Sequence, residues 1–552
     1  MPFIDPAEAV ALQSKMSSDK SQLGKIFVAK SSKFHTRNVD HSLVEGLLAD
    51  GWEEYGQNLK TKTRLRKPKS HNVQFEDDVW CQLYRLGYRT LNVDENFCLP
   101  FGSEPSDKKQ IDVVAIDHDS VLLVECKSSE SSAKPPSFKT EFEALRFRLD
   151  GYRKAVDQTF GPGRRIKYIF ATRNLRLSRD STDVLRLVES GGFYYNDNTF
   201  QYVDSLLKAY RNAAHYQFMG LIMKGQSINK EKIEVPAIEG TMGGKVYYMF
   251  SLEPQLLLKI GFVLHRTRAN ESEMPTYQRL LVPSRLKGIT KFIDNGGFFP
   301  NSAILNFNER DTKLEFQGQQ RSKDSVSRTG ILKIPNAFAI AYIIDGQHRI
   351  YGYANSKYKA NNTIPVVAFK NLEPSDQLEL FMQINENQKA VSPTLRITLE
   401  EDLYWSSNRL DSRLKALRSS VIRALGGDNS GPLYNKISLG EDRAMLQAKP
   451  FADALLKCKL LPEAKGNKFV NGTTAAALYD SANLNHSDEM MKARIKTVGF
   501  INACYELAED ALKQHQDTLN AYILSNRGSF AFVSLGSGLI TRTGRLRRER
   551  RR

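Results

Sequence analysis

Residues 111–127 read I-D-V-V-A-I-D-H-D-S-V-L-L-V-E-C-K, and this stretch decides how the rest of the chain is interpreted. Two apolar runs rich in β-branched residues, 111–116 and 121–127, flank the polar group Asp117–Ser120. Polar turn formers between two such runs predict a β-hairpin with a four-residue loop. Because both faces of the two strands are largely apolar, we expect the hairpin to be central in its sheet.

The hairpin register places charged side chains together. If Ile116 pairs with Val121, then Asp112 lies directly opposite Glu125, and two like charges so placed destabilise a sheet. A bound Mg²⁺ or Mn²⁺ ion would turn this repulsion into coordination. Lys127 lies two residues after Glu125 and therefore emerges on the same face. The alternative interpretation is an exposed hairpin with scattered charges.

The segment before the hairpin has the spacing of an amphipathic helix over residues 72–87, with Asn72 as its cap and Gly87 at its end. Together, these features resemble the PD-(D/E)xK nuclease superfamily, closest to Mrr-like restriction endonucleases, over roughly residues 72–175. The resemblance implies that Asp112, Glu125 and Lys127 are catalytic, that Asp112 and Glu125 bind the metal, and that Glu76 is the helical acid of the family. Taken alone, Glu76 reads as a solvated helix residue. Ile111 stands where the family often has proline.

The residues after the hairpin continue an α/β pattern. Apolar residues at helical spacing predict a helix over 139–160, and 166–172 reads as a strand. Strand, helix and strand in this order form an α/β crossover, which supports a mixed sheet around the hairpin. We expect this nuclease-like domain to end near residue 225.

A second motif lies at residues 339–356, A-I-A-Y-I-I-D-G-Q-H-R-I-Y-G-Y-A-N-S. A buried strand is expected to end at the Asp345-Gly346 turn, and a helix to follow. Glycine at such a turn lets backbone N–H groups approach an anion, and Gln347, His348 and Arg349 add donors. These five residues are therefore predicted to contact a phosphate of DNA or of a nucleotide. A polar turn packed against a loop is the alternative.

The D-G-Q-H-R motif itself resembles the DGQHR domain of DndB-type proteins, which belong to DNA-modification and defence systems. The resemblance covers residues 245–400 and implies a fold distantly similar to ParB and sulfiredoxin, together with DNA binding or nucleotide hydrolysis. Two further motifs, Y-Q-R at 277–279 and F-x-x-I-N-x-x-Q-K-x-V-S at 381–392, match the family pattern. They add candidate phosphate-binding residues: Gln278, Arg279, Asn385, Gln388 and Lys389.

The overall composition agrees with a nucleic-acid partner. The 552 residues carry a formal net charge of +17, with basic clusters at 60–69 and at the extreme C-terminus. There is no apolar run long enough to span a membrane, and the N-terminus lacks the features of a signal peptide. The five cysteines form no C-x-x-C pair, so we expect neither structural zinc nor disulfides, and a reducing cytoplasm.

The predicted fold class is α/β, as a multi-domain α+β chain. Its parts are a PD-(D/E)xK-like mixed-sheet core, a ParB/sulfiredoxin-like DGQHR domain and a helical C-terminal region. The expected boundaries are a basic N-terminal segment at 1–70, the nuclease-like domain at 71–225, the DGQHR domain at 240–400, helices at 401–535 and a disordered basic tail at 536–552.

We therefore predict an Mg²⁺- or Mn²⁺-dependent DNA endonuclease of a bacterial defence or DNA-modification system, with a DGQHR domain that senses DNA or nucleotide. DNA is the expected partner, no membrane is involved, and ATP or another nucleotide and a homo-oligomer are left open. Two alternatives remain: a non-cleaving DNA-binding regulator of a modification system, and a nucleotide hydrolase that uses the DGQHR turn.

Overall fold

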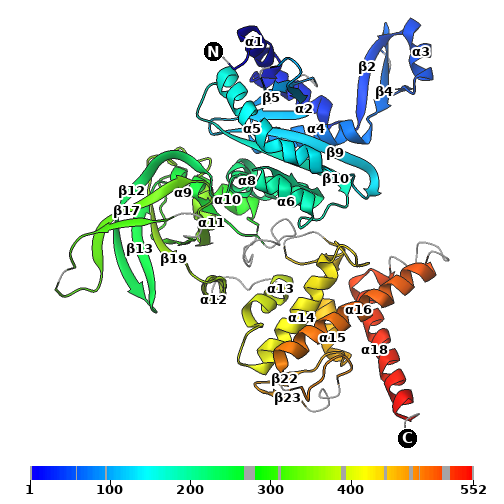
Figure 1. Ribbon diagram of the computed structural model, residues 1–552, viewed down its shortest axis with the longest axis vertical. Coiled ribbons are helices and arrows are strands. Elements are labelled where there is room, and N and C mark those ends of the chain that lie inside the picture. The colour runs from blue at the N-terminus through cyan, green and yellow to red at the C-terminus, as the bar shows by residue number, and fades with distance from the viewer. Residues whose placement is uncertain are drawn as a thin grey trace.

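The computed structural model has mixed α/β architecture, which confirms the predicted fold class (Figure 1). Within the described residues, one six-stranded and one eight-stranded sheet are followed by a mainly helical C-terminal region. The structure describes residues 3–57, 59–93, 96–102, 104–265, 280–308, 313–321, 323–386, 393–440, 444–470, 476–483, 485–512 and 522–549.

The six-stranded sheet has the order β1-β5-β8-β9-β10-β11. The first four strands pair antiparallel and the last three pair parallel, as the crossover pattern predicts. Its strands are β1 (Met16–Ser17), β5 (Thr90–Asn92), β8 (Val113–Ile116), β9 (Ser120–Ala133), β10 (Arg165–Leu175) and β11 (Phe193–Tyr195). The short strands β6 (Cys98–Pro100) and β7 (Lys108–Gln110) form a separate ribbon beside it.

The predicted hairpin is formed by β8 and β9 in the centre of this sheet. The pairing of Ile116 with Val121 is confirmed, and Val113 pairs with Val124, so Asp112 follows next to Glu125. The connection is shorter than predicted because β9 begins at Ser120. The Asp117 side chain explains this, since its Oδ1 accepts from the Ser120 backbone N–H at 2.6 Å.

Helices cover both faces of the six-stranded sheet. Alternate residues of the hairpin separate into two cores, with Val113 and Val124 on one side and Val114 and Leu123 on the other. Helices α4, α7 and α8 contribute to the first core, and α1, α5 and α6 to the second. Their bounds are α1 (Pro6–Ser14), α4 (His71–Leu86), α5 (Lys139–Phe160), α6 (Thr182–Glu189), α7 (Asp197–Tyr210) and α8 (Ala214–Ile222).

The predicted helices at 72–87 and 139–160 are confirmed as α4 and α5. Gly87 ends α4 in the left-handed conformation, with φ 109°. The predicted cap was wrong: Ser70 is the residue before the helix, whereas Asn72 lies in its first turn and accepts a hydrogen bond from Ser128 Oγ at 2.7 Å.

The basic N-terminal segment is folded and is not separate from the six-stranded sheet. Strand β1 pairs with β5, and Leu12 of α1, together with Ile4 just before the helix, packs into the core beside α5. The same segment also forms a three-stranded sheet with the order β2-β4-β3. The further elements are α2 (Lys20–Ser31), β2 (Phe34–Asp40), η1 (His41–Leu43), α3 (Val44–Ala49), β3 (Glu53–Glu54) and β4 (Lys62–Pro68).

The eight-stranded sheet has the order β14-β18-β15-β19-β13-β12-β17-β16 and mixes parallel and antiparallel pairs. Its strands are β12 (Ser227–Met242), β13 (Lys245–Leu252), β14 (Gly261–Phe262), β15 (Ala303–Phe307), β16 (Glu315–Gly318), β17 (Arg328–Ala337), β18 (Ala341–Asp345) and β19 (Ile364–Lys370). The associated helices are α9 (Pro254–Ile260), α10 (Pro283–Asp294), α11 (Gln347–Gly352) and α12 (Pro374–Glu386).

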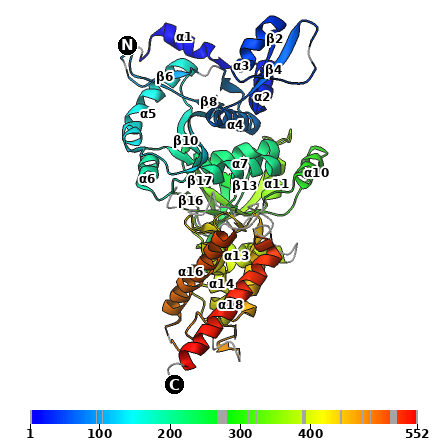
Figure 2. The same cartoon turned by 90° about the vertical axis from the view of Figure 1, so that its right-hand side faces the viewer.

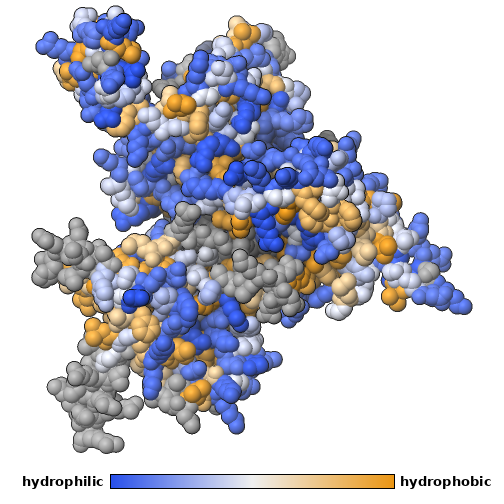
Figure 3. Space-filling view, turned by 180° about the vertical axis from the view of Figure 1, so that it is seen from behind, coloured by the Kyte–Doolittle hydropathy of each residue, from blue (hydrophilic) through white to orange (hydrophobic). Residues whose placement is uncertain are grey.

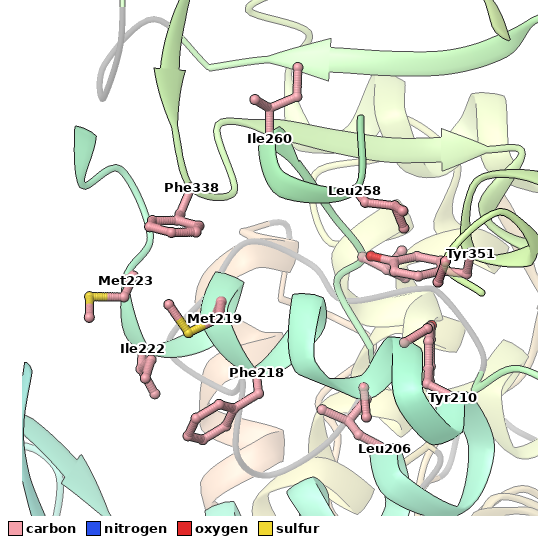
Figure 4. Packing of buried hydrophobic residues seen from close by; sticks show 14 of the residues in the cluster. Leu206, Tyr210, Phe218, Met219, Ile222, Met223, Leu258, Ile260, Phe338 and Tyr351 are labelled. Atoms are coloured by element: carbon pink, nitrogen blue, oxygen red, sulfur yellow. The ribbon is translucent and has the colours of Figure 1, made fainter. Parts of the chain in front are cut away.

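One hydrophobic core is continuous between the two large sheets. It includes Phe75 and Val124 of the first unit together with Ile343 and Ile350 of the second. Figure 4 shows the junction, where Tyr210 of α7 lies beside Tyr351 and Met219 of α8 points toward Phe338, while Phe218 lies on the opposite side of α8. Since apolar burial is the dominant force in folding, this shared core ties the two sheets together.

A separate core holds the C-terminal helices (Figure 2). They are α13 (Pro393–Tyr404), α14 (Leu410–Gly427), α15 (Ala448–Lys457), α16 (His486–Leu512) and α18 (Asn526–Glu549). The predicted disorder of 536–552 was wrong for residues 536–549, which belong to α18; residues 550–552 lie outside the described part. Tertiary contact explains the helix, because α18 packs on α15 and α16 and buries Val533.

No helix in the described part of the chain is long and apolar enough to cross a membrane.

Candidate active site

The hairpin brings Asp112 and Glu125 to neighbouring positions. Asp112 immediately precedes β8, and its Oδ2 accepts a hydrogen bond from the backbone N–H of Cys126 at 2.7 Å. The Asp112 carboxylate therefore lies against β9, beside the residue that follows Glu125. The backbone of Asp112 is also fixed, since its carbonyl accepts from Asn92 Nδ2 at 3.1 Å.

The Glu125 carboxylate is buried and only half satisfied. Its side chain is 7% exposed, and its Oε1 accepts from Lys127 Nζ at 2.6 Å. Its Oε2 is buried and accepts no hydrogen bond. Burying an unpaired carboxylate oxygen is costly, so this atom points to a ligand that carries positive charge.

The electrostatics of Asp112 agree with this. Burial, followed by the nearby charge of Glu125, raises the pKa of Asp112 to about 6. The hydrogen bond from the Cys126 N–H and the charges of Lys127 and Lys109 act in the opposite direction and lower this pKa. At neutral pH, two carboxylates share a poorly hydrated space. A divalent cation would relieve this repulsion, and two carboxylates are the kind of ligands through which proteins commonly hold Mg²⁺.

Lys127 lies on the same face, as predicted from the two-residue spacing. Burial alone would lower the pKa of Lys127, but the charge and hydrogen bond of Glu125, with Asp112 and Glu141, raise it above its usual value. The Lys127 side chain thus remains an ammonium group at neutral pH. It is a cation and hydrogen-bond donor, and not a base.

A second lysine, Lys109, also reaches Glu125 and was not predicted. Its Nζ lies 3.5 Å from Glu125 Oε1 and forms an ion pair with Glu141 of α5. Tyr168 donates a hydrogen bond to the same Glu141 oxygen at 3.4 Å. The sequence gives only a weak signal for Lys109, a pair of lysines at 108–109 shortly before Asp112.

Glu76 lies on the wall of the pocket that contains Asp112. The pocket has a volume of about 510 Å³ and lies between α2, α4, β2 and the start of β8. Glu76 is close enough to the hairpin to affect Cys126: burial raises the pKa of that thiol, and Asp112, Glu76 and Glu125 raise it further. Among the described residues, no three His, Cys, Asp or Glu side chains are arranged to hold a metal ion. Glu76 thus lines the pocket beside Asp112.

The D-G-Q-H-R turn lies on the other large sheet, between β18 and α11. Gly346 has φ 95°, so a residue without Cβ is needed there. The Arg349 guanidinium is already engaged: Nη2 donates to Asp345 Oδ2 at 2.9 Å and to the Ser302 carbonyl at 3.1 Å, and Nη1 donates to the Asn301 carbonyl. A phosphate would have to compete with these bonds.

Gln347 and His348 point into the protein. Gln347 is 9% exposed and its Oε1 accepts from Tyr210 of α7 at 3.3 Å. The His348 Nε2 is buried and has no hydrogen-bond partner, and burial together with the charge of Arg285 lowers the pKa of His348 to about 4. The motif therefore contacts α7 through Gln347 and residues 301–302 through Arg349. Its role toward phosphate stays a prediction.

The other predicted phosphate-binding residues are largely not described. Gln278, Arg279, Gln388 and Lys389 lie outside the described residues, and Asn385 is in the last turn of α12. The predicted residues thus lie in two places. Asp112, Glu125 and Lys127 belong to the first sheet, with Glu76 of α4 at the pocket wall beside them, and the D-G-Q-H-R turn belongs to the second sheet.

Comparison with known proteins gives one similarity. Residues 235–417 match the family model of DndB, described as DNA-sulfur modification-associated. The match contains the D-G-Q-H-R turn and leaves out the β8–β9 hairpin. No curated protein and no solved structure matches the chain.

Proposed function

We propose that the chain is an Mg²⁺- or Mn²⁺-dependent DNA endonuclease that hydrolyses phosphodiester bonds at the β8–β9 hairpin. The observation that carries this proposal is the buried Glu125 Oε2, which has no hydrogen-bond partner and belongs to a carboxylate that lies beside Asp112 and two lysines. Most buried carboxylate oxygens in proteins have a hydrogen-bond partner, so an unsatisfied one beside a second carboxylate calls for an explanation. Perturbed carboxylates next to a pocket are typical of functional sites.

Each residue has a separate role in this proposal. Asp112 and Glu125 would hold the metal ion, which, when bound, supplies positive charge and a water of lowered pKa. Lys127 stays protonated and therefore orients the attacking water or a phosphate oxygen and stabilises the negative charge that develops on the phosphate. Glu76, on the pocket wall, would assist through hydrogen bonds to water.

The setting follows from the second sheet. The match of residues 235–417 to a DNA-sulfur modification-associated family supports a role in such a modification system, and the net charge of +17 supports DNA as the partner. We propose that the second sheet senses DNA or its modification state. Binding of ATP or another nucleotide at the 345–349 turn remains a prediction.

A second candidate is a non-cleaving DNA-binding regulator of the modification system. The family match favours it, because the matched residues do not include Asp112, Glu125 or Lys127. In that case the bond between Lys127 and Glu125 would be a structural ion pair. The two candidates differ in whether phosphodiester bonds are broken.

The test is incubation of supercoiled plasmid, modified and unmodified, with the protein and Mg²⁺ or Mn²⁺. Wild-type protein should nick or linearise at least one plasmid, and Asp112→Ala, Glu125→Ala and Lys127→Ala should each lose about a hundredfold or more of this activity while still binding DNA. Glu130→Ala is the matched control, because Glu130 is an exposed carboxylate on the same strand. Full activity of Glu125→Ala would contradict the site. DNA binding by the wild type without cleavage of either plasmid would favour the regulator.

A further inference from the structure

The small sheet formed by β2, β4 and β3 projects from the body of the molecule (Figures 1 and 2). Strands β2 and β4 form a seven-residue antiparallel ribbon from the Phe34–Pro68 pair to the Asp40–Lys62 pair. Figure 3 shows hydrophilic side chains over most of this projecting unit. An isolated ribbon is only marginally stable, so its buried side needs support from η1, α3 and β3.

The two faces of the ribbon are different. Thr63 and Leu65 of β4 are buried, whereas Lys62, Arg64 and Arg66 alternate with them and are exposed or half-buried. Alternate residues of a strand share a face and are spaced by about 6.7 Å. The ribbon thus carries a row of three cations along one face, and the exposed Lys60 lies just before β4.

Acidic residues offset this charge only in part. Glu53 of β3 accepts a hydrogen bond from Arg66 Nε at 2.7 Å, and Asp40 pairs across the ribbon with Lys62. The opposite positions on β2 along the rest of this face are the neutral Thr36 and Asn38. The face remains positive, which is the property that phosphate contacts need.

The aromatic rings of this unit are already covered. The Arg66 guanidinium lies 4.5 Å from the centre of the Phe34 ring and 5.8 Å from that of Tyr55, and Arg37 lies 5.0 Å from that of Trp52. Proteins that bind single-stranded nucleic acid without sequence preference stack bases on open aromatic rings. Covered rings beside a row of cations favour a duplex, whose bases are not available for stacking.

The base of the ribbon leads to the candidate active site. Residues 34–37 of β2 line the same 510 Å³ pocket as Asp112 and Glu76. Phe34 and Thr36, which share the face of the cation row, therefore border this pocket. This continuity connects a binding surface with the carboxylate pair.

We infer that the β2–β4 ribbon docks in the major groove of duplex DNA and places one strand at the pocket that contains Asp112. The cations lie on β4, the central strand of the small three-stranded sheet, and proteins that read DNA with a β-sheet place strands in a major groove about 12 Å wide, where such cations contact phosphates at its edge. The evidence for docking in the groove comes from the ribbon itself. The delivery of a strand for cleavage rests on the proposed function.

The experiment measures binding of a fluorescent 24-base-pair duplex by anisotropy in Ca²⁺ at several salt concentrations. The triple variant Lys60→Ala/Lys62→Ala/Arg64→Ala should bind at least tenfold more weakly. Its salt dependence should be less steep by up to about 2.7, because each lost phosphate contact removes about 0.9 from the slope. The charge-preserving triple Lys60→Arg/Lys62→Arg/Arg64→Lys should keep wild-type affinity and slope. Arg146→Ala/Arg153→Ala/Lys154→Ala, which removes three exposed cations of α5, is the matched control.

Two competitors identify the groove. Methyl green, which occupies the major groove, should displace the wild-type protein, and distamycin, which occupies the minor groove, should not. Three results would each overturn the inference. The first is equal affinity and salt slope for the wild type and the alanine triple, and the second is displacement by distamycin alone. The third is tighter binding of a 24-nucleotide single strand that the alanine triple abolishes. Ca²⁺ is used here only to measure DNA binding. A wild type that fails to cleave plasmid but binds DNA in the expected pattern would therefore refute only the proposed function.

Discussion

The Lys259 ammonium of α9 lies 2.7 Å from the Asp119 carboxylate, in the loop of the β8–β9 hairpin. A second contact joins the same loop to α8, where His215 Nε2 lies 3.3 Å from Asp117 Oδ2. The hairpin therefore has the carboxylate pair at one end and contacts with the helices that support the second sheet at the other. The hairpin strands between these two ends are buried on both faces, where close packing leaves little room for a shift.

The first prediction concerns this contact. Lys259→Met should raise amide hydrogen exchange in residues 117–124 and 257–263 together, because each segment loses its partner. The effect on global stability should be below about 1 kcal/mol, because both side chains are partly exposed. Exchange is read by mass spectrometry of the intact chain.

Lys245→Met is the control, since Lys245 forms a comparable ion pair with Asp376 far from the hairpin loop. Faster exchange in only one of the two segments would contradict coupling through the ion pair.

Much of the hairpin could be predicted because its signals are local. The β-branched runs and the turn residues between them give the pairing of Ile116 with Val121, and that pairing places Asp112 beside Glu125. Helices α4 and α5 follow from apolar spacing alone. These features depend on residues within one or two elements, where periodicity and burial agree.

The features that were missed depend on contacts between distant segments. Lys109 reaches Glu125 from a separate ribbon, and the position of β1 beside β5 joins residues about 75 apart in the chain. The partners of Arg349 include the carbonyls of 301 and 302, which no local pattern indicates. Helix α18 forms from a Gly- and Ser-containing sequence because tertiary packing outweighs its low propensity.

The second prediction follows from the pKa of Asp112. Its rise from 3.8 to about 6 means that the folded protein holds this proton more tightly than the unfolded chain. The stabilising effect of protonation is therefore present below about pH 4 and is lost as the pH rises through 6. In EDTA at pH 8, Asp112→Asn should raise the melting temperature above that of the wild type. The gain in the free energy of unfolding should be at most about 3 kcal/mol. Near pH 4, the substitution should have little effect.

The measurement is the difference in melting temperature between variant and wild type from pH 4 to pH 8. The amide oxygen that Asp112→Asn introduces can still accept the Cys126 N–H bond, so the comparison isolates charge. With Mn²⁺ the order should reverse, because only the wild type gains a ligand. A difference that does not change with pH would show that Asp112 is not an electrostatically destabilised carboxylate.

The third prediction concerns His348, whose pKa is lowered to about 4 by burial and by the charge of Arg285. As the pH falls, the unfolded chain protonates His348 near pH 6.5, whereas the folded chain does so only near pH 4. The stability that neutral His348 contributes is therefore complete above about pH 6.5 and is lost as the pH falls through 4. His348→Gln should therefore lose less thermal stability than wild type between pH 7 and pH 4.5.

Asn361→Gln, at an exposed position of the same unit, serves as the control, because it changes no titrating group. Identical pH profiles for wild type and His348→Gln would mean that His348 is not kept neutral by its surroundings.

The last prediction separates a structural role of Arg349 from a phosphate-binding role. Arg349 is 15% exposed and holds Asp345 and the carbonyls of 301 and 302 together, so its removal takes the charged donor away from all three acceptors. Arg349→Ala should destabilise this junction by about 1–3 kcal/mol and raise amide exchange in 299–304 and 345–352. Arg349→Lys should do nearly the same, because an ammonium group cannot span three acceptors as a planar guanidinium does. Lys359→Ala, at an exposed position nearby, is the control. If Arg349→Ala instead keeps wild-type exchange but loses affinity for DNA or ATP, then the guanidinium serves a ligand and the bonds to 301, 302 and Asp345 are only its resting contacts.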